Sequence, residues 1–210
     1  MAIDPASYLR SAMAYMSYAM SPRPFPNRKS SPHRPIILIP GSSGSPHYLA
    51  NLAHHLNLLD HAGPIYTYCY KPRSMEDGIE QLKRVVKECG AREIDLIGHS
   101  QGAMIACKYA YVGVPDVEVN QVISIAGRLR PIGRIKWLYN KLIPYIEAIE
   151  EAEKPTLATI AGSHDWIVPQ EAVHVAAPAR RTTVMGAGHL SVIHHKVTRD
   201  TLSNLLRINS

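Results

Sequence analysis

Cysteine is scarce in this sequence. The 210 residues contain three, Cys69, Cys89 and Cys107, with no Cys-x-x-Cys pair, and an odd count leaves at least one thiol unpaired. These features argue against a disulfide framework, so stability must come from a buried apolar core. With 46% apolar residues, the chain is long enough for one such domain and short for two.

Long apolar runs are also missing. No stretch approaches the roughly eighteen consecutive apolar residues that a membrane-spanning helix needs. The N-terminal residues lack the basic segment and continuous apolar segment of a secretion signal. We therefore expect a soluble, cytoplasmic protein.

Positive charge is in excess but is not concentrated. The net charge is +6, and basic residues gather locally only at 23–34 and 128–141. No basic stripe with interleaved aromatic residues occurs, which argues against a nucleic-acid partner and leaves anionic surfaces or substrates as the favoured alternative. The sequence has 11 histidines but neither a His-Glu-x-x-His motif nor Cys/His ligand spacing, so we predict no metal or other cofactor.

Residues 1–35 differ in character from the rest. Asp4 and Pro5 resemble an N-cap and first helical residue, and they predict a helix to about Met20. We expect its apolar face to dock on the domain. Binding to a membrane surface is an alternative, although Arg10 is the only basic residue on its polar face. The Pro-rich, basic residues 21–35 predict a linker, so the main domain is expected at 36–210.

Apolar, β-branched runs alternate with helical patterns from Ile36 onward. Strands are predicted at 36–39, 65–70, 94–97, 119–125, 156–160 and 182–185. Helices are predicted at about 47–59, 75–88, 101–112, 134–153, 169–175 and 190–207. This alternation predicts an α/β fold, with a six-stranded, mostly parallel sheet and helices on both faces.

A Gly-x-Ser-x-Gly motif, Gly98 to Gly102, lies between a predicted strand and a predicted helix. This is the context of a nucleophile elbow, a tight strand-to-helix turn that exposes a strained serine, here Ser100, at the carboxyl edge of the sheet. The glycines allow neighbouring elements to approach where a Cβ would clash. An ordinary glycine-containing turn is the alternative interpretation.

A serine hydroxyl needs a base and an acid that orients the base. Asp165 directly follows the run at 156–161, and His189 directly follows the next run, so both are expected at the carboxyl ends of strands. The chain order Ser100, Asp165, His189 is also the order expected for this type of site. The alternatives are weaker because of their positions, and they are His164, His194, His195, Asp95 and Asp116.

A negatively charged tetrahedral intermediate needs two hydrogen-bond donors. One is expected to be the backbone N–H of Gln101, which follows the serine and begins a helix. The other is expected from the loop after the first strand, where Gly41 and Gly44 allow close approach, and we assign it to the N–H of Ser42.

The segments IDLIGHSQG, GSHDWIVP and GAGHL resemble, in order and spacing, the nucleophile, acid and histidine segments of small lipases and esterases of the α/β-hydrolase family. The resemblance runs from Ile36 to the last helix, and it implies acyl transfer to water through an acyl-serine, without a cofactor. Two departures occur. Pro40 precedes Gly41 where the family usually has histidine, and the antiparallel strands that usually come first are missing.

The substrate class is left broad by the sequence. We expect a small or lipid-like acyl ester, with a thioester or lysophospholipid as alternatives because the same site serves all three. A catalytically silent binding module is a further alternative. Because only residues 128–155 separate two predicted strands, a crossover helix from Pro144 leaves at most a short flap at 128–143 and no large cap.

Overall fold

The computed structural model describes residues 31–113, 116–130, 143–151, 154–175 and 180–208. Its centre is a six-stranded sheet with the strand order β2-β1-β3-β4-β5-β6. Every pair of neighbouring strands is parallel, which confirms the predicted α/β fold. The strands are β1 (Ile36–Ile39), β2 (Ile65–Thr67), β3 (Glu93–His99), β4 (Glu118–Ile125), β5 (Thr156–Gly162) and β6 (Arg180–Val184).

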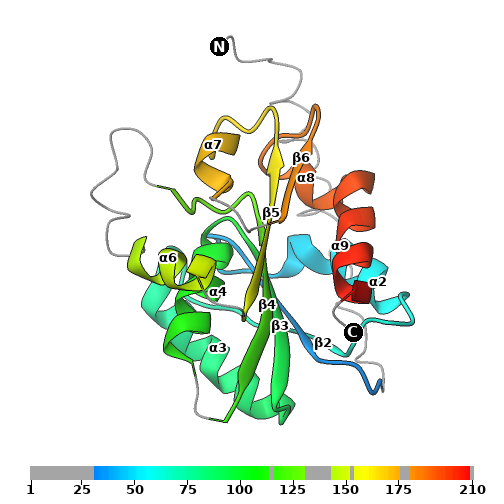
Figure 1. Cartoon of the computed structure of the whole chain (residues 1–210), viewed down its shortest axis with the longest axis vertical. Coiled ribbons are helices and arrows are strands. Elements are labelled where there is room, and N and C mark those ends of the chain that lie inside the picture. The colour runs from blue at the N-terminus through cyan, green and yellow to red at the C-terminus, as the bar shows by residue number, and fades with distance from the viewer. Residues whose placement is uncertain (1–30, 114–115, 131–142, 152–153, 176–179, 209–210) are drawn as a thin grey trace.

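Helices cover both faces of the sheet (Figure 1). One layer contains α3 (Met75–Cys89), α4 (Gln101–Val112) and α6 (Ile143–Glu151). The opposite layer contains η1 (His47–Leu49), α2 (Ala50–Asn57), α8 (Ser191–His194) and α9 (Lys196–Ile208). The short helix α7 (Gln170–Val173) follows β5.

The side chains of β1 show how this three-layer arrangement follows from the sequence. Ile37 and Ile39 point into the core beneath α3 and α4, whereas Ile36 and Leu38 point into the core beneath α2 and α9. All four are fully buried. A strand buried on both faces must be apolar at every position, which is why β1 is a continuous apolar run.

The structure ends β2 three residues before the predicted end at Tyr70. The N–H of Tyr70 donates to Gly44 O, 3.0 Å away, instead of extending the ladder with β1. Cys69, which we expected within a strand, is an exposed residue after its end. A hydrogen bond to a distant loop therefore overrides the local strand preference of this segment.

The segment predicted as the last helix, residues 190–207, forms two helices in the structure. His195 has the extended backbone angles φ −69° and ψ 143°, and it separates α8 from α9. His194 ends α8, and His195 is not helical, so the prediction that both lie inside one helix was wrong. Thr198 donates its side-chain O–H to Val192 O, and this bond joins the two helices across the break.

Several predictions fall on residues outside the described ranges. The N-terminal helix, residues 21–30 of the linker and residues 131–142 of the proposed flap are among them. The predicted crossover helix is confirmed as α6, with Pro144 in its first turn. Within the described ranges, no helix has the length and hydropathy needed to span a membrane.

The turn between β3 and α4 leaves no space for side chains at its two glycines. A Cβ at Gly102 would lie 2.3 Å from Ile39 O, and a Cβ at Gly98 would lie 2.4 Å from Ala103 N. Both neighbours are backbone atoms, so relief would require a shift of β1 or of α4. The first turn of α4 thus packs directly on β1.

Gly102→Ala should lower the free energy of unfolding by about 3 kcal/mol or more, because the added methyl group overlaps the β1 backbone. Gly90→Ala is the matched control. Gly90 has a φ of 64° with open space around it, so only backbone strain of about 1–2 kcal/mol is expected. Urea unfolding measures both, and equal losses in the two variants would contradict the packing described here.

Burial lowers the pKa of four histidines in the described structure, His55, His99, His174 and His194. The pKa of His194 falls to about 4, mainly through desolvation and to a lesser extent through the charge of Arg199. Desolvation holds the pKa of His99 well below its usual value. Below about pH 6.5 the unfolded chain therefore binds protons that the native state does not, and stability falls as the pH decreases.

Wild-type protein should lose about 1 kcal/mol more stability between pH 6.5 and 5 than His194→Gln loses. The titration of one group can change the free energy of unfolding by at most about 1.4 kcal/mol per pH unit. The expected loss is smaller than this limit because His194 is not fully buried. Urea unfolding of both proteins across this range gives the difference directly. If the free energies of unfolding of the two proteins fell equally between pH 6.5 and 5, His194 would not contribute to the loss of stability in acid.

Candidate active site

Ser100 occupies the turn between β3 and α4 in a strained backbone conformation. Its φ of 54° and ψ of −121° are rare for a residue with a side chain. The turn is held from both sides, because Ser100 N–H donates to Ile125 O at 2.9 Å and Ala103 N–H donates to Ser100 O at 3.1 Å. The predicted strand-to-helix turn and its strained serine are therefore present.

His189 follows β6 and reaches the serine. Its Nε2 lies 3.0 Å from Ser100 Oγ. The other ring nitrogen, Nδ1, lies 2.7 Å from Asp165 Oδ2, in a contact buried from solvent. Because a carboxylate only accepts hydrogen bonds, Nδ1 carries the proton and Nε2 is left to accept the serine proton.

Asp165 follows β5, in a loop that fixes both of its oxygens. Oδ1 accepts the backbone N–H groups of Ile167 and Val168, at 2.9 and 2.8 Å. Oδ2 is the atom that faces His189. Three donors to one buried carboxylate occupy both of its oxygens and prevent its rotation. The structure thus brings Ser100, His189 and Asp165 into one continuous hydrogen-bonded series.

The alternative residues lie in other environments. Asp95 is near the amino end of β3, where burial raises its pKa and Asn120 donates to its Oδ1 at 3.0 Å. Asp116 is an exposed residue shortly before β4. His164 contacts the hydroxyl of Ser163, and His195 Nδ1 accepts the N–H of Val197.

Two backbone segments predicted to supply N–H donors lie beside the serine. Gln101 is the first residue of α4, where backbone N–H groups have no acceptor within the helix. Ser42 lies in the exposed loop after β1. The preceding residue, Gly41, packs close to the nucleophile, since a Cβ at Gly41 would lie 3.2 Å from Ser100 Cβ.

Tyr70 holds the peptide group between Gly41 and Ser42. Its hydroxyl lies 2.6 Å from Gly41 O and 3.0 Å from Pro40 O, and Gly44 N–H also donates to Gly41 O. A trans peptide is planar, with its N–H opposite its C=O. Fixing Gly41 O toward Tyr70 therefore aims the N–H of Ser42 away from Tyr70. Sequence reasoning missed Tyr70, which carries no local motif.

His99 is a second residue that sequence reasoning missed. It is the variable residue before the serine in the Gly-x-Ser-x-Gly motif, and it is 3% exposed. Its ring contacts the Tyr48 hydroxyl on one side and the backbone carbonyl of His189 on the other. The motif specifies only its serine and glycines, so the residue type at the variable position gives no signal of a role for His99.

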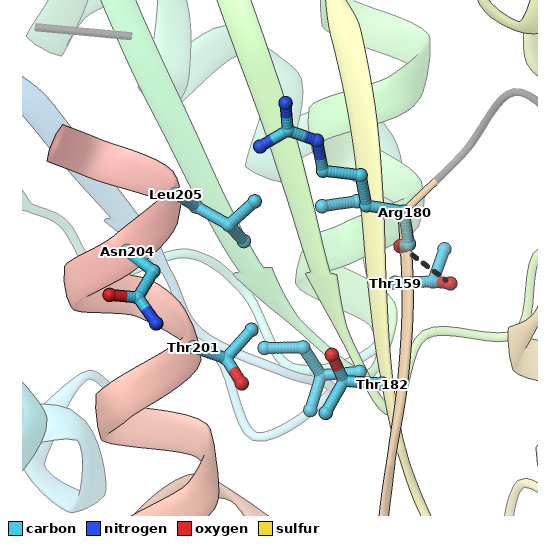
Figure 2. A pocket seen from close by; sticks show the side chains of 8 residues that line it. Thr159, Arg180, Thr182, Thr201, Asn204 and Leu205 are labelled. Atoms are coloured by element: carbon cyan, nitrogen blue, oxygen red, sulfur yellow. Dashed lines mark hydrogen bonds between the residues drawn. The ribbon is translucent and has the colours of Figure 1, made fainter. Parts of the chain in front are cut away.

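Other candidate sites in the described structure are less developed. A cavity of about 280 Å³ lies between β5, β6 and α9, with Thr182, Thr201 and Asn204 along its walls (Figure 2). None of the residues predicted for the site lines it. Within the described ranges, no three His, Cys, Asp or Glu side chains gather in a possible metal site.

Comparison with known proteins identifies the fold. No protein family and no curated protein sequence matches this chain. A carboxylesterase structure from Nitrososphaera gargenis aligns with a TM-score of 0.62 and 15% identity, covering 87% of this chain and 93% of the other. A Paleococcus ferrophilus monoacylglycerol lipase aligns with a TM-score of 0.63 and 14% identity, covering 88% and 98%.

A third structure, a serine hydrolase homologue from Coxiella burnetii, aligns with a TM-score of 0.60 and 22% identity, covering 88% of each chain. The chain spans nearly the whole length of these proteins. All three similarities concern the arrangement of the same parallel sheet and its helices, with no large cap evident in the part of the chain described. The chain therefore has the α/β-hydrolase fold, which it shares with known esterases, lipases and serine hydrolases.

Proposed function

We propose that the protein is a serine hydrolase that cleaves carboxylic esters through an acyl-serine intermediate. One observation carries the proposal. Asp165, His189 and Ser100 form a continuous hydrogen-bonded series, 2.7 and 3.0 Å long at its two contacts, at the carboxyl edge of the sheet. The similar folds of known esterases and lipases support the same chemistry.

In the first half of the reaction, Ser100 Oγ attacks the carbonyl carbon of the ester. His189 Nε2 takes the serine proton, and the carbonyl π electrons move to oxygen. The N–H groups of Ser42 and Gln101 stabilise this oxyanion, as the helix dipole of α4 also does. The bond to the alcohol oxygen then breaks, and His189 gives the alcohol its proton.

In the second half, water takes the place of the alcohol. His189 removes a proton from water as its oxygen attacks the acyl carbon, and a second oxyanion forms at the same position. Collapse breaks the bond to Ser100 Oγ, which recovers a proton from His189. The Asp165 carboxylate accepts the Nδ1–H of His189 and stabilises the imidazolium that forms in each half. No metal or cofactor takes part in these steps.

Apolar side chains near the site favour a lipid-like acyl group. Trp166, Ile167 and Met185 are 51%, 42% and 74% exposed, although each is large and apolar. They lie on the loops that carry Asp165 and precede His189. These loops are joined by hydrogen bonds from Ser163 N–H to Val184 O and from His164 N–H to Ala187 O. These three side chains, the exposed rim, offer contact area to an acyl chain because they lie on the loops that carry Asp165 and lead to His189.

A thioester or a lysophospholipid is the nearest alternative substrate, because the same nucleophile and donors serve both. A silent binding module is the alternative from another class. The hydrogen-bonded series from Asp165 to Ser100 favours an enzyme, because a binding module has no need of an oriented base beside a strained serine. Turnover of p-nitrophenyl esters separates the enzyme from the module.

Ser100→Ala should lower turnover of a p-nitrophenyl ester by at least about 10³-fold, because the nucleophile is lost. Asp165→Asn and His189→Ala should each lower turnover comparably. Combining either substitution with Ser100→Ala should lower turnover little further. Ser203→Ala is a matched control on α9, where the hydroxyl donates to Arg199 O, and it should keep wild-type activity. Steady-state rates and melting temperatures are measured together.

Comparable activity in Ser100→Ala would exclude Ser100 as the nucleophile. A large further loss on combining Ser100→Ala with His189→Ala would show that the two residues do not act as one unit.

The site should be open and should prefer acyl chains of short to medium length. The exposed rim supports this, and residues 128–143 are too few for a large cap. Rates on soluble esters should rise smoothly with substrate concentration through the solubility limit. A sharp increase at that limit would instead indicate a mobile lid that opens on lipid surfaces, with residues 128–143 as the first segment to test.

A further inference from the structure

Three buried hydrogen bonds join the loop after β1 to the loop that carries His189. The N–H of Gly41 lies 2.5 Å from Tyr48 Oη. The same Oη lies 3.1 Å from His99 Nδ1. On the far side of the ring, His99 Nε2 lies 3.0 Å from the backbone oxygen of His189.

The chemistry of the two ends fixes the direction of every bond in this series. A backbone carbonyl only accepts, so His99 Nε2 carries a proton and donates it to His189 O. Burial lowers the pKa of His99, so the ring is neutral and its Nδ1 is an acceptor. The Tyr48 hydroxyl must then donate to Nδ1, which leaves its oxygen to accept the Gly41 N–H. Within this series, each of the three bonds therefore has one direction.

The series connects the three parts of the site that must keep their distances. Gly41 precedes Ser42, the proposed oxyanion donor, and a Cβ at Gly41 would lie 3.2 Å from Ser100 Cβ. His99 precedes Ser100 on β3. The last acceptor is the backbone of His189 itself. Tyr48 and His99 are 8% and 3% exposed, so water does not compete for these bonds.

We propose that Tyr48 and His99 are positioning residues for catalysis, which hold the oxyanion loop and the backbone of the base in register with Ser100. This proposal rests on the proposed function. Neither side chain touches the substrate or gains a proton during the reaction. Their effect is on geometry, and displacements well below 1 Å at a base or donor reduce catalysis strongly.

Tyr48→Phe removes one oxygen atom and breaks the series, and the chain offers a matched control. Tyr68 is also 8% exposed, and its buried hydroxyl has no hydrogen-bond partner in the described structure. Tyr48→Phe should lower kcat for a soluble aryl ester by about 10-fold, with KM changed by less than about twofold. Tyr68→Phe should change kcat by less than about twofold. Both variants are assayed well below their melting temperatures.

A double-mutant cycle tests whether the two residues act in series. His99→Gln removes the acceptor at the Nδ1 position but keeps an amide that can donate to His189 O. Because Tyr48 acts through His99, the double variant Tyr48→Phe/His99→Gln should lose about as much kcat as the more damaged single variant. Independent structural effects would multiply the two losses instead.

¹⁵N NMR of the histidine rings provides a readout that does not need turnover. In wild-type protein His99 should be neutral, with a protonated Nε2 and an unprotonated, hydrogen-bonded Nδ1. Tyr48→Phe should shift the Nδ1 resonance and leave Nε2 protonated. A proton on Nδ1 of wild-type His99 would overturn the direction of the series and the proposal with it.

The remaining outcomes distinguish the two proposals. An active wild-type protein with unchanged kcat in Tyr48→Phe would overturn the positioning role and leave the proposed function standing. Equal losses in Tyr48→Phe and Tyr68→Phe would also overturn it, because loss of any buried hydroxyl would then suffice. A wild-type protein with no ester turnover would overturn the proposed function and, with it, the catalytic role of Tyr48 and His99.

Discussion

The close approach of α4 to β1 is the constraint on which the site depends. Gly102 and Gly98 let backbone atoms meet where a Cβ would overlap them, and the chain can therefore turn from strand to helix within one residue. That residue is Ser100, forced to a φ of 54°. The Ser100 hydroxyl faces His189 because the fixed backbone of the turn cannot point it in another direction.

The parallel sheet supplies the remaining parts. Because all strands run in one direction, the loops after β1, β3, β5 and β6 emerge at the same edge. Each loop is then fixed by hydrogen bonds rather than by packing alone. Two backbone N–H groups hold Asp165, Tyr70 holds the Gly41–Ser42 peptide, and Tyr48 with His99 joins that loop to His189.

Features that depend on residues close together in the sequence could be predicted from the sequence alone. Ser100, Asp165 and His189 could be identified because each comes shortly after a run with a strand pattern, and helix α4 was predicted with its observed bounds. The break at His195 carried no signal in the helical pattern of 190–207. The early end of β2 could not be predicted either, since it depends on a hydrogen bond to a loop outside the strand. Tyr48, Tyr70 and His99 were missed for the same reason. Tyr48 meets His99 across 51 residues and Tyr70 meets Gly41 across 29, and no short motif records such pairings.

The central claim is that Ser100 is an activated nucleophile, and covalent labelling tests it most directly. The protein is treated with an alkyl fluorophosphonate, digested and mapped by mass spectrometry. We expect one adduct, on the peptide that contains Ser100, and labelling that is far slower in His189→Ala, where no base accepts the serine proton. An unlabelled wild-type protein, or an adduct on another residue with Ser100 unmodified, would contradict the account.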